Sequence, residues 1–270
     1  WLEGAINHDT ITELEVVDRL YQCRQKQDLF QGYSFDTISG SGPNGAIIHY
    51  RADEKSNRTL KSSDIFLLDS GGQYLDGTTD ITRTISLNKA PSAEQKDRYT
   101  RVLKGHIALA TARFPEGTVG SQLDPLARYH LWQIGCDYAH GTGHGVGSYL
   151  GVHEGPQRIS PVPNTVPLLP GMIVSNEPGY YKQGEYGIRI ENLVLVKRVP
   201  KEDCADDGKT MLCFETITLV PIDTSLVDKD LLTKDEIGWV NRYHQRVYAA
   251  LNDQVDDATK PWLQKATASI

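Results

Sequence analysis

The sequence lacks the features of several protein classes. Its 270 residues include fewer basic than acidic side chains, 28 against 35, for a formal net charge of −7. This balance argues against binding nucleic acid regardless of its sequence, because such proteins present a basic face to the phosphates. No apolar run approaches the roughly 18 residues of a membrane span, and no charged-then-apolar leader opens the chain. We therefore expect neither a nucleic-acid partner nor a membrane partner.

Cysteine is also scarce, and no two cysteines have Cys-x-x-Cys spacing. The four are Cys23, Cys136, Cys204 and Cys213. A structural zinc site is therefore disfavoured, and a disulfide framework is not implied in a chain of this length. We expect reduced thiols and a cytoplasmic location. The chain begins at Trp1 without a methionine and enters a helix almost at once. We interpret it as a fragment or a processed chain, with sequence missing upstream.

Helices are predicted where apolar side chains recur every three to four residues. This pattern covers 12–29, and Ser92 with Gln95 fits a capping box that opens a second helix. A third helix is predicted over 121–134, and the tail is predicted to be helical from Asp235 onward.

Strands are predicted in the intervening apolar or alternating segments. These are 42–50 (a turn feeding a short strand), 64–70, 73–87, 171–179, 186–198 and 211–220. The segment 73–87 is expected to be a hairpin with Asp76 and Gly77 at its bend. No low-complexity linker divides the chain. The order of helix, strands, helices, strands and helix predicts an α/β domain whose strands curve around one site, with helices outside.

A glycine-rich stretch, HGTGHGVGSYLGVHEGP at 140–156, contains three histidines. His140 and His144 have the spacing of a zinc-protease motif, but that motif needs a helix, and interior glycines oppose one by about 1 kcal/mol each. The stretch does not match a nucleotide-binding loop either, since no Lys-Ser or Lys-Thr follows. The glycines would permit a close backbone approach or a positive φ angle. Taken alone, the stretch leaves a structural turn, a metal site and another catalytic role open.

Four acids occur within or beside apolar strands: Asp69, Asp80, Glu177 and Glu191. Each alone could be a solvated strand end. Period-two alternation places Arg189 on the same face as Glu191. If the four carboxylates were buried together, they would repel one another unless cations lay between them. Two divalent ions would balance the four charges, and a neutral histidine would be a fifth ligand. Such an oxygen-rich site suits manganese or a similar ion better than structural zinc.

These motifs resemble a known family. DSGGQYLDGTTDITRT, HGTGHGVGS…VHEGP, NEPGYY and GIRIEN resemble the catalytic domain of aminopeptidase P, the Xaa-Pro aminopeptidases. GPNGAIIHY and VLKGHIALATARFPEGT resemble its cytosolic, eukaryotic-type branch. The resemblance implies the pita-bread fold, an α/β fold with a curved mixed sheet and helices outside. It also implies a catalytic domain over 1–221 and a C-terminal helical extension over 222–270, without the upstream N-terminal domains that this branch carries.

The same resemblance implies the roles of particular residues. It assigns the ligands of two divalent metal ions to Asp69, Asp80, His144, Glu177 and Glu191. It places His49, His140 and His153 around the substrate, and Tyr181 and Arg189 near Asp69. The metal expected from the family is Mn²⁺, with Zn²⁺ or Co²⁺ as alternatives, and a homodimer is expected.

The implied reaction is removal of the first residue from peptides with proline in the second position. A hydroxide bridging the metals would attack the scissile carbonyl, which His140 or His153 would help to polarise. Glu177 would carry the proton to the leaving nitrogen. His49 would line the pocket, and Arg189 would orient Asp69.

Three alternatives differ in ways that can be tested. A prolidase would cleave Xaa-Pro dipeptides and no longer peptide. A methionine aminopeptidase fits less well, because NEPGYY and the long tail favour the proline-specific branch. A non-catalytic pita-bread module would bind peptides or other proteins without metal. Four histidines match no motif: His106 and His130 are predicted to be helix residues without a catalytic role, and His8 and His244 to lie at the surface.

Overall fold

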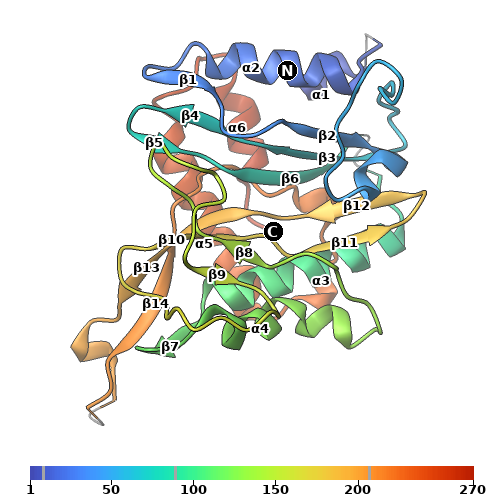
Figure 1. The fold of residues 1–270 in the computed structure, drawn as a ribbon. Helices are drawn as coiled ribbons and strands as arrows, with labels where there is room; N and C mark the ends of the chain where they lie inside the picture. Colours follow the sequence, from blue (N-terminus) through green and yellow to red (C-terminus); the bar gives the residue numbers. More distant parts are fainter. Residues whose placement is uncertain (8–9, 88–89, 206–207) are drawn as a thin grey trace.

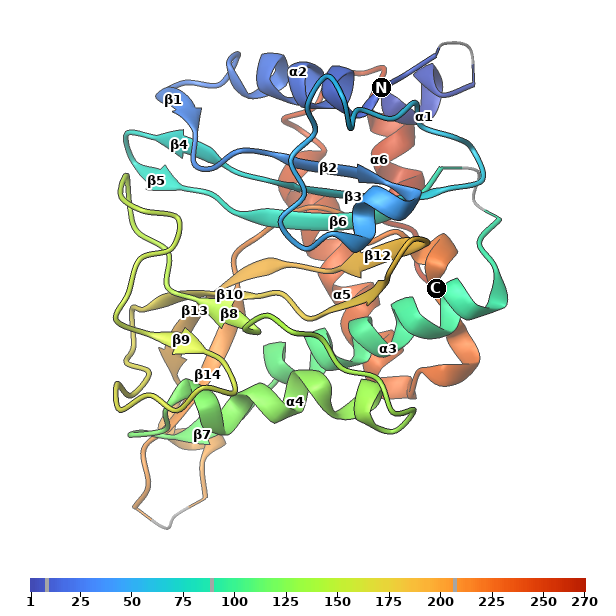
Figure 2. The same ribbon diagram turned by 45° about the vertical axis from the view of Figure 1, so that its right-hand side comes forward.

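Helices surround a curved set of strands in the computed structural model, which describes residues 1–7, 10–87, 90–205 and 208–270 (Figure 1). The helices are α1 (Leu2–Ala5), α2 (Glu13–Arg24), α3 (Ala93–Ala110), α4 (Gly120–Trp132), α5 (Lys234–Leu251) and α6 (Lys260–Ala266). In Figures 1 and 2, α1 and α2 run along the top, α3 and α4 along the bottom, and α5 and α6 behind the strands. Across the described residues, no helix combines the length and apolarity needed to cross a bilayer.

The strands form five small ladders, all of them antiparallel. One ladder joins β1 (Phe30–Tyr33), β4 (Gly72–Tyr74) and β5 (Gly77–Thr78), and another joins β2 (Ile38–Ser41), β3 (Ile65–Ser70) and β6 (Ile81–Ser86). The ladder with the most strands has the strand order β10 (Ile173–Asn176), β13 (Asn192–Arg198), β14 (Met211–Thr216) and β7 (Arg113–Pro115). Two pairs remain, β11 (Gly179–Lys182) with β12 (Tyr186–Arg189), and β8 (Gly143–His144) with β9 (Arg158–Ile159). The α/β class is confirmed, but the expected mixed sheet is not found among these pairs.

The two halves of the strand layer meet where β12 lies against β6. The Thr84 hydroxyl accepts a hydrogen bond from the Arg189 amide at 3.0 Å and donates one to its carbonyl at 3.1 Å. Chain segments more than 100 residues apart are thereby joined, and β12 lies beside β6 at this junction (Figure 2).

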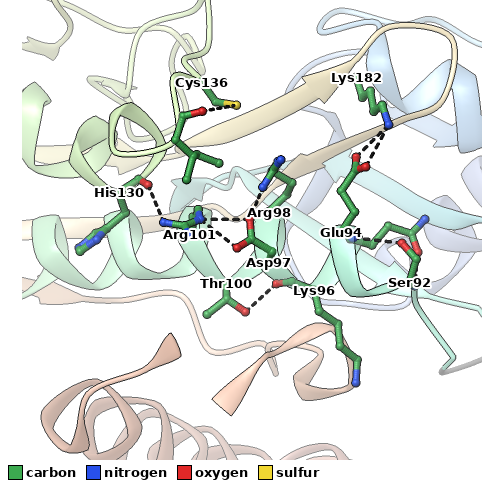
Figure 3. A network of polar contacts seen from close by, with 12 residues as sticks. Ser92, Glu94, Lys96, Asp97, Arg98, Thr100, Arg101, His130, Cys136 and Lys182 are labelled. Carbon is green, nitrogen blue, oxygen red and sulfur yellow. Dashed lines mark hydrogen bonds and ion pairs between the residues drawn. The ribbon is translucent and has the colours of Figure 1, made fainter. Parts of the chain in front are cut away.

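Short-range sequence signals determine where helix α3 begins and which of its faces is buried. The Ser92–Gln95 capping box is present at the start of α3, and the apolar stripe of that helix is buried. Lys182 of β11 binds Glu94 at 2.9 Å, and Arg101 donates to the carbonyl of His130 in α4 at 3.3 Å (Figure 3). These contacts join α3 to β11 and α4. All four cysteines are free thiols.

The tail is not a separate body. Val240, Tyr243 and Val247 of α5 are buried in the main apolar core with residues of α3. His244, predicted to lie at the surface, is fully buried, and its Nε2 accepts the Ile222 amide proton at 3.1 Å. That prediction was wrong because the face of α5 that carries His244 packs against the segment around Ile222, which precedes the helix.

Several element boundaries also differ from the prediction. The helix predicted over 12–29 ends at Arg24, and β1 follows. Residues 42–46 form a short 3-10 helix after β2, so no strand lies at 42–50. The hairpin predicted over 73–87 consists only of β4 and β5 and ends at Thr78. The rest of the predicted segment is the separate strand β6, which pairs with β3. His8 lies outside the described residues.

Further short 3-10 helices cover Lys201–Asp203, Thr224–Leu226 and Lys229–Leu231. The predicted strand over 186–198 is divided into β12 and β13, with Glu191 between them. This break turns the chain so that the carboxylate of Glu191 reaches the junction of the two halves.

Candidate metal centre

All five predicted metal ligands line one cleft of about 300 Å³ at the junction of the two halves. They come from distant parts of the chain: Asp69 from β3, Asp80 from the turn before β6, His144 from β8, Glu177 from the residue after β10, and Glu191 from the break between β12 and β13. Asp80, His144 and Glu191 each offer a ligand atom, and these three atoms lie within 4.8 Å of one another. The fold therefore brings together what the sequence only suggested.

Asp69 is a buried carboxylate with two unlike oxygens. Its Oδ2 accepts a hydrogen bond from Nη2 of Arg189 at 2.6 Å. Its Oδ1 is buried and, among the described residues, has no hydrogen-bond partner. A buried acceptor without a partner costs about 1–3 kcal/mol, so Oδ1 has the character of a ligand atom.

His144 presents a lone pair to two carboxylates. Its Nδ1 lies 2.9 Å from the carbonyl oxygen of Gly145, which can only accept, so Nδ1 carries the proton. The Nε2 atom lies 3.4 Å from Oδ2 of Asp80 and 3.4 Å from Oε1 of Glu177. A lone pair facing two carboxylates is repulsive unless a proton or a cation lies between them.

Hydroxyl groups hold the two glutamates. Thr82 donates to Oε2 of Glu191 at 2.7 Å and accepts from Nε of Arg189 at 3.1 Å. Ser175 donates to Oε1 of Glu177 at 2.9 Å, and the His144 amide donates to the same hydroxyl at 3.0 Å. Arg189 and Glu191 were expected on one face of a continuous strand; the strand ends at Arg189, but both side chains still contact Thr82.

Burial and mutual repulsion favour the protonated acids in this cleft. Burial, followed by the charges of Asp69 and Glu177, raises the pKa of Asp80 well above its usual value. Burial and then Asp80 do the same for the pKa of Glu191, and burial raises that of Glu177. Metal cations would replace these protons, because a cation stabilises the same carboxylates in their charged form.

The donor set fits a pair of hard or borderline divalent ions. Four carboxylates and one imidazole are oxygen-rich ligands with a single nitrogen, as Mn²⁺ and similar ions prefer. The unpartnered Oδ1 of Asp69 and the lone pair of His144 each supply a ligand atom that no described protein group satisfies. Arg189 donates a hydrogen bond to the other oxygen of Asp69, Oδ2, and so orients the carboxylate as a metal ligand requires.

The glycines beside His144 permit close approach of the backbone. A Cβ atom added at Gly143 would lie 1.9 Å from the carbonyl oxygen of Ser175, and one at Gly145 would lie 2.0 Å from that of Glu154. Neither glycine has a positive φ angle. Of the two explanations offered for these glycines, close approach applies: β8 lies against β10 and the 154–157 turn at backbone distance.

A hydrogen-bonded chain connects His140 to Asp69. Nδ1 of His140 donates to the Gly141 carbonyl at 2.7 Å, since that oxygen can only accept. Burial, followed by the charge of Arg189, lowers the pKa of His140 to about 3, so the ring is neutral and its Nε2 accepts from the Tyr181 hydroxyl at 2.8 Å. Arg189 in turn donates to Tyr181 at 2.6 Å. Both nitrogens of His140 are thus engaged.

Tyr181 supports the cleft without lining it. Its hydroxyl lies between His140 and Arg189, and burial raises its pKa to about 12, so it stays protonated. Arg189 is buried; although burial opposes its charge, Tyr181 and Asp69 hold its pKa above the usual value.

The other two predicted histidines lie at the cleft with fewer contacts. His49 is exposed and lines the cleft from the loop after the first 3-10 helix. His153 lines it from the segment between β8 and β9, and its ring lies edge-on to that of His144 at 4.1 Å between centroids. Burial, followed by the charge of His144, lowers the pKa of His153.

The sequence reasoning missed some residues of this site. Thr82 and Ser175 were not named, although each lies two residues from a predicted ligand, Asp80 and Glu177 respectively. The apolar and charged wall was also missed, because all of its residues except Ile38, which begins β2, lie in loops and carry no periodic signal. It consists of Phe35, Asp36, Ile38, Ile48, Arg51 and Val152.

A larger cavity of about 620 Å³ lies elsewhere, between α1, the strands β3 and β6, and the C-terminal segment. None of the predicted site residues lines it. Its size does not make it the reactive site, because the clustered titratable groups that chemistry requires are in the smaller cleft.

Comparison with known proteins gives two family matches. Residues 2–198 match the model described as metallopeptidase family M24, and residues 210–270 match that of the C-terminal region of peptidase M24. The curated relatives include aminopeptidase P2 of Arabidopsis thaliana, 52% identical over 100% of this chain and 38% of that protein. The probable Xaa-Pro aminopeptidase P of Metarhizium acridum is 50% identical over 100% of this chain and 44% of that protein. The chain thus spans about two fifths of the length of these relatives.

Solved structures are similar as well. The X-prolyl aminopeptidase of Caenorhabditis elegans, described as a cytosolic enzyme with a di-nuclear active site, superposes with a TM-score of 0.94 at 43% identity, over 100% of this chain and 44% of that one. The prolidase of Pyrococcus furiosus superposes with a TM-score of 0.62 at 32% identity, over 71% of this chain and 55% of that one.

Proposed function

The chain belongs to metallopeptidase family M24, and we propose that it is the catalytic part of an enzyme that removes the first residue from peptides with proline in the second position. Its fold is the pita-bread fold of that family. We assign residues 1–221 to the catalytic domain and 222–270 to its helical extension, whose α5 shares the main core.

One observation carries the proposal: four carboxylates and the lone pair of His144 converge on a single cleft. The arrangement is electrostatically unfavourable for the protein alone, so we assign Asp69, Asp80, His144, Glu177 and Glu191 as ligands of two divalent ions. When bound, such ions would neutralise the acids, polarise the scissile carbonyl and lower the pKa of a water molecule.

The residues of the chain would then move and hold protons. Glu177, held by Ser175, takes a proton from the attacking water on a carboxylate oxygen. It delivers that proton to the proline nitrogen as the carbon–nitrogen bond breaks.

The histidines divide the remaining work. We propose that His153 donates a hydrogen bond to the scissile carbonyl oxygen, because both nitrogens of His140 are engaged by Gly141 and Tyr181. His140, Tyr181 and Arg189 act as a positioning chain that orients Asp69. His49 contacts the substrate from the exposed side of the cleft.

The apolar part of the wall suits a proline ring. Four apolar residues line the cleft: Phe35, Ile38, Ile48 and Val152. Proline lacks an N–H, so a pocket that surrounds its ring with apolar groups leaves no donor unpaired.

We extend the proposal to metal, location and assembly. We propose Mn²⁺ as the metal from the oxygen-rich donor set, and a cytoplasmic location from the C. elegans relative. We propose a homodimer from the resemblance; the exposed side chains of Leu126, Tyr129 and Trp132 on α4 and Trp262 on α6 are surfaces that could support one.

A prolidase is the second candidate, favoured by the superposition with the P. furiosus enzyme. The identity is lower there, 32% over 71% of the chain, than with the aminopeptidase relatives. A binding module without catalysis is disfavoured, because the ligand set has no missing member.

One assay tests the proposal. The metal-free protein is mixed with Arg-Pro-Pro, Mn²⁺ is added, and free arginine is measured. We expect release only after the metal is added. Glu177→Ala abolishes it without loss of the circular-dichroism spectrum, whereas Glu116→Ala, a change at an exposed acid outside the cleft, does not. Cleavage of Arg-Pro but not of Arg-Pro-Pro would identify a prolidase instead.

A further inference from the structure

The cleft has an ion pair among its lining residues that the reaction does not use. Nη1 of Arg51 lies 2.9 Å from Oδ2 of Asp36, and the two side chains are 75% and 64% exposed. Both residues line the cleft that holds the buried acids. Asp80 and Glu191, by contrast, are only 5% and 1% exposed. The pair therefore marks the open side of the cleft, and the acids mark its buried side.

The proposed reaction sets the direction of the substrate. The amino end and the scissile bond must lie among the buried acids, where the ions would be held. The rest of the peptide then runs outward, and each further residue advances it by at most about 3.3–3.6 Å. The carboxyl-terminal side of the peptide consequently passes the exposed wall that includes Arg51.

Arg51 is the exposed cation among the residues that line the cleft. The lining holds five carboxylates and two guanidinium groups. The other guanidinium, that of Arg189, is buried and is engaged by Asp69 and Tyr181. Across the described ranges, Asp36 is the only acidic partner of Arg51, and the contact uses a single nitrogen. A guanidinium presents five donors that match a carboxylate, so Arg51 can bind a second one.

We propose that Arg51, anchored by Asp36, is a specificity-determining residue that binds a carboxylate on the carboxyl-terminal side of the substrate. This rests on the proposed function and adds to it a substrate class, acidic or short peptides. The carboxylate has two sources with the same chemistry: the C-terminus of a short peptide, or an acidic side chain after the proline.

The experiment compares peptides that differ in one charge. Arg-Pro-Pro is compared with its C-terminal amide, and Arg-Pro-Glu-amide with Arg-Pro-Gln-amide. KM and kcat are measured for the protein, for Arg51→Glu and Arg51→Gln, and for Lys55→Glu as a control. Lys55 is exposed and does not line the cleft, so this control makes the same change of charge nearby.

Binding is measured separately from turnover. Calorimetric titration of the Mn²⁺-loaded protein uses analogues of the same peptides in which the scissile amide is a methylene-amine that cannot be hydrolysed. An exposed ion pair is worth up to about 1 kcal/mol, or about fivefold in affinity. We expect the charged member of one or both peptide pairs to bind about fivefold more tightly and to have a correspondingly lower KM, with kcat unchanged.

Arg51→Gln should remove that preference, Arg51→Glu should reverse it, and Lys55→Glu should preserve it. Preference in the first peptide pair identifies the C-terminus as the source, and preference in the second identifies the side chain. Equal binding within both pairs, or preference that survives in Arg51→Gln, overturns the proposal. Peptides that bind with the expected preference but are not cleaved would contradict the proposed function and leave the role of Arg51 standing.

Discussion

Arg189 binds one carboxylate oxygen of Asp69 and leaves the other without a described partner. The Nη2–Oδ2 distance is 2.6 Å, and both side chains are buried. The ion pair fixes the orientation of the carboxylate, while the free Oδ1 points to a ligand that the protein does not supply. A structural ion pair would be expected to satisfy both oxygens. This asymmetry supports a positioning role for Arg189.

Arg189→Lys should weaken metal binding. Arginine contacts Asp69, Tyr181 and Thr82 at once, whereas the single ammonium of lysine cannot make all three contacts. Loss of a residue that orients a metal ligand typically lowers affinity by about 10–100-fold, and we expect that loss for Mn²⁺. Calorimetric titration of the metal-free protein measures it. Arg113→Lys, at an exposed position, is the control, and equal affinities of the two variants would contradict the assigned role.

Thr82→Val should destabilise the cleft, and Thr82→Ser should not. The Thr82 hydroxyl lies between Glu191 and Arg189, and valine has nearly the same shape without it. Leaving buried polar groups unpaired costs about 1–3 kcal/mol. Urea unfolding of the metal-free variants measures this difference. If the valine and serine variants unfold alike, the hydroxyl has no such bridging role.

Gly143→Ala should disturb β8 and the His144 that it carries. The added methyl group would lie 1.9 Å from the Ser175 carbonyl oxygen, so the backbone must move. We expect a loss of about 1–3 kcal/mol in the free energy of unfolding, together with weaker Mn²⁺ binding. Gly4→Ala is the matched control, because nothing lies within 4 Å of its added Cβ. Normal stability and metal affinity in Gly143→Ala would show that the strands are not held at backbone contact.

His106→Gln should make the protein less sensitive to acid. His106 is fully buried, and burial followed by the charge of Arg83 lowers its pKa from 6.5 to about 3. Below pH 6.5 the unfolded chain binds a proton on His106 that the folded chain does not. The contribution of the neutral, buried imidazole to the free energy of unfolding is therefore complete above pH 6.5 and is lost as the pH falls toward 3. At pH 5 the loss is about 2 kcal/mol, at about 1.4 kcal/mol for each pH unit.

Urea unfolding at pH 7.5 and pH 5 measures this contribution. The free energy of unfolding should fall between these pH values by about 2 kcal/mol less in His106→Gln than in the unaltered protein. A glutamine side chain can still accept from Asn192, the 3.2 Å partner of the imidazole. Equal falls in the two proteins would mean that His106 does not titrate in this way.

Local sequence signals predicted the elements whose causes are themselves local. The Ser92–Gln95 capping box and the apolar stripe of α3 lie within one helix, so their pattern was sufficient. Asp69 and Asp80 were recognised because carboxylates beside apolar strands are unusual. Their convergence with Glu191 was a hypothesis that only the pairing of β3 with β6, and the contact of β12 with β6, could establish.

Features that depend on distant chain segments were not predictable in the same way. His244 is buried because Ile222, 22 residues earlier, covers it. The pairing of β6 with β3 rather than β5 depends on register across the sheet, which alternation alone does not specify. The engagement of both nitrogens of His140 required the position of Tyr181, 41 residues away. The wall residues Asp36 and Arg51 lie in loops without periodicity.

The most direct test of the account is a crystal structure of the protein soaked in Mn²⁺, with anomalous data collected at the manganese edge. We expect two anomalous peaks in the cleft, both within ligand distance of carboxylate oxygens of Asp69, Asp80, Glu177 and Glu191, and one of them bound by Nε2 of His144. A cleft without manganese peaks, in which the four carboxylates turn toward bulk water, would contradict the claim that paired cations hold these acids together.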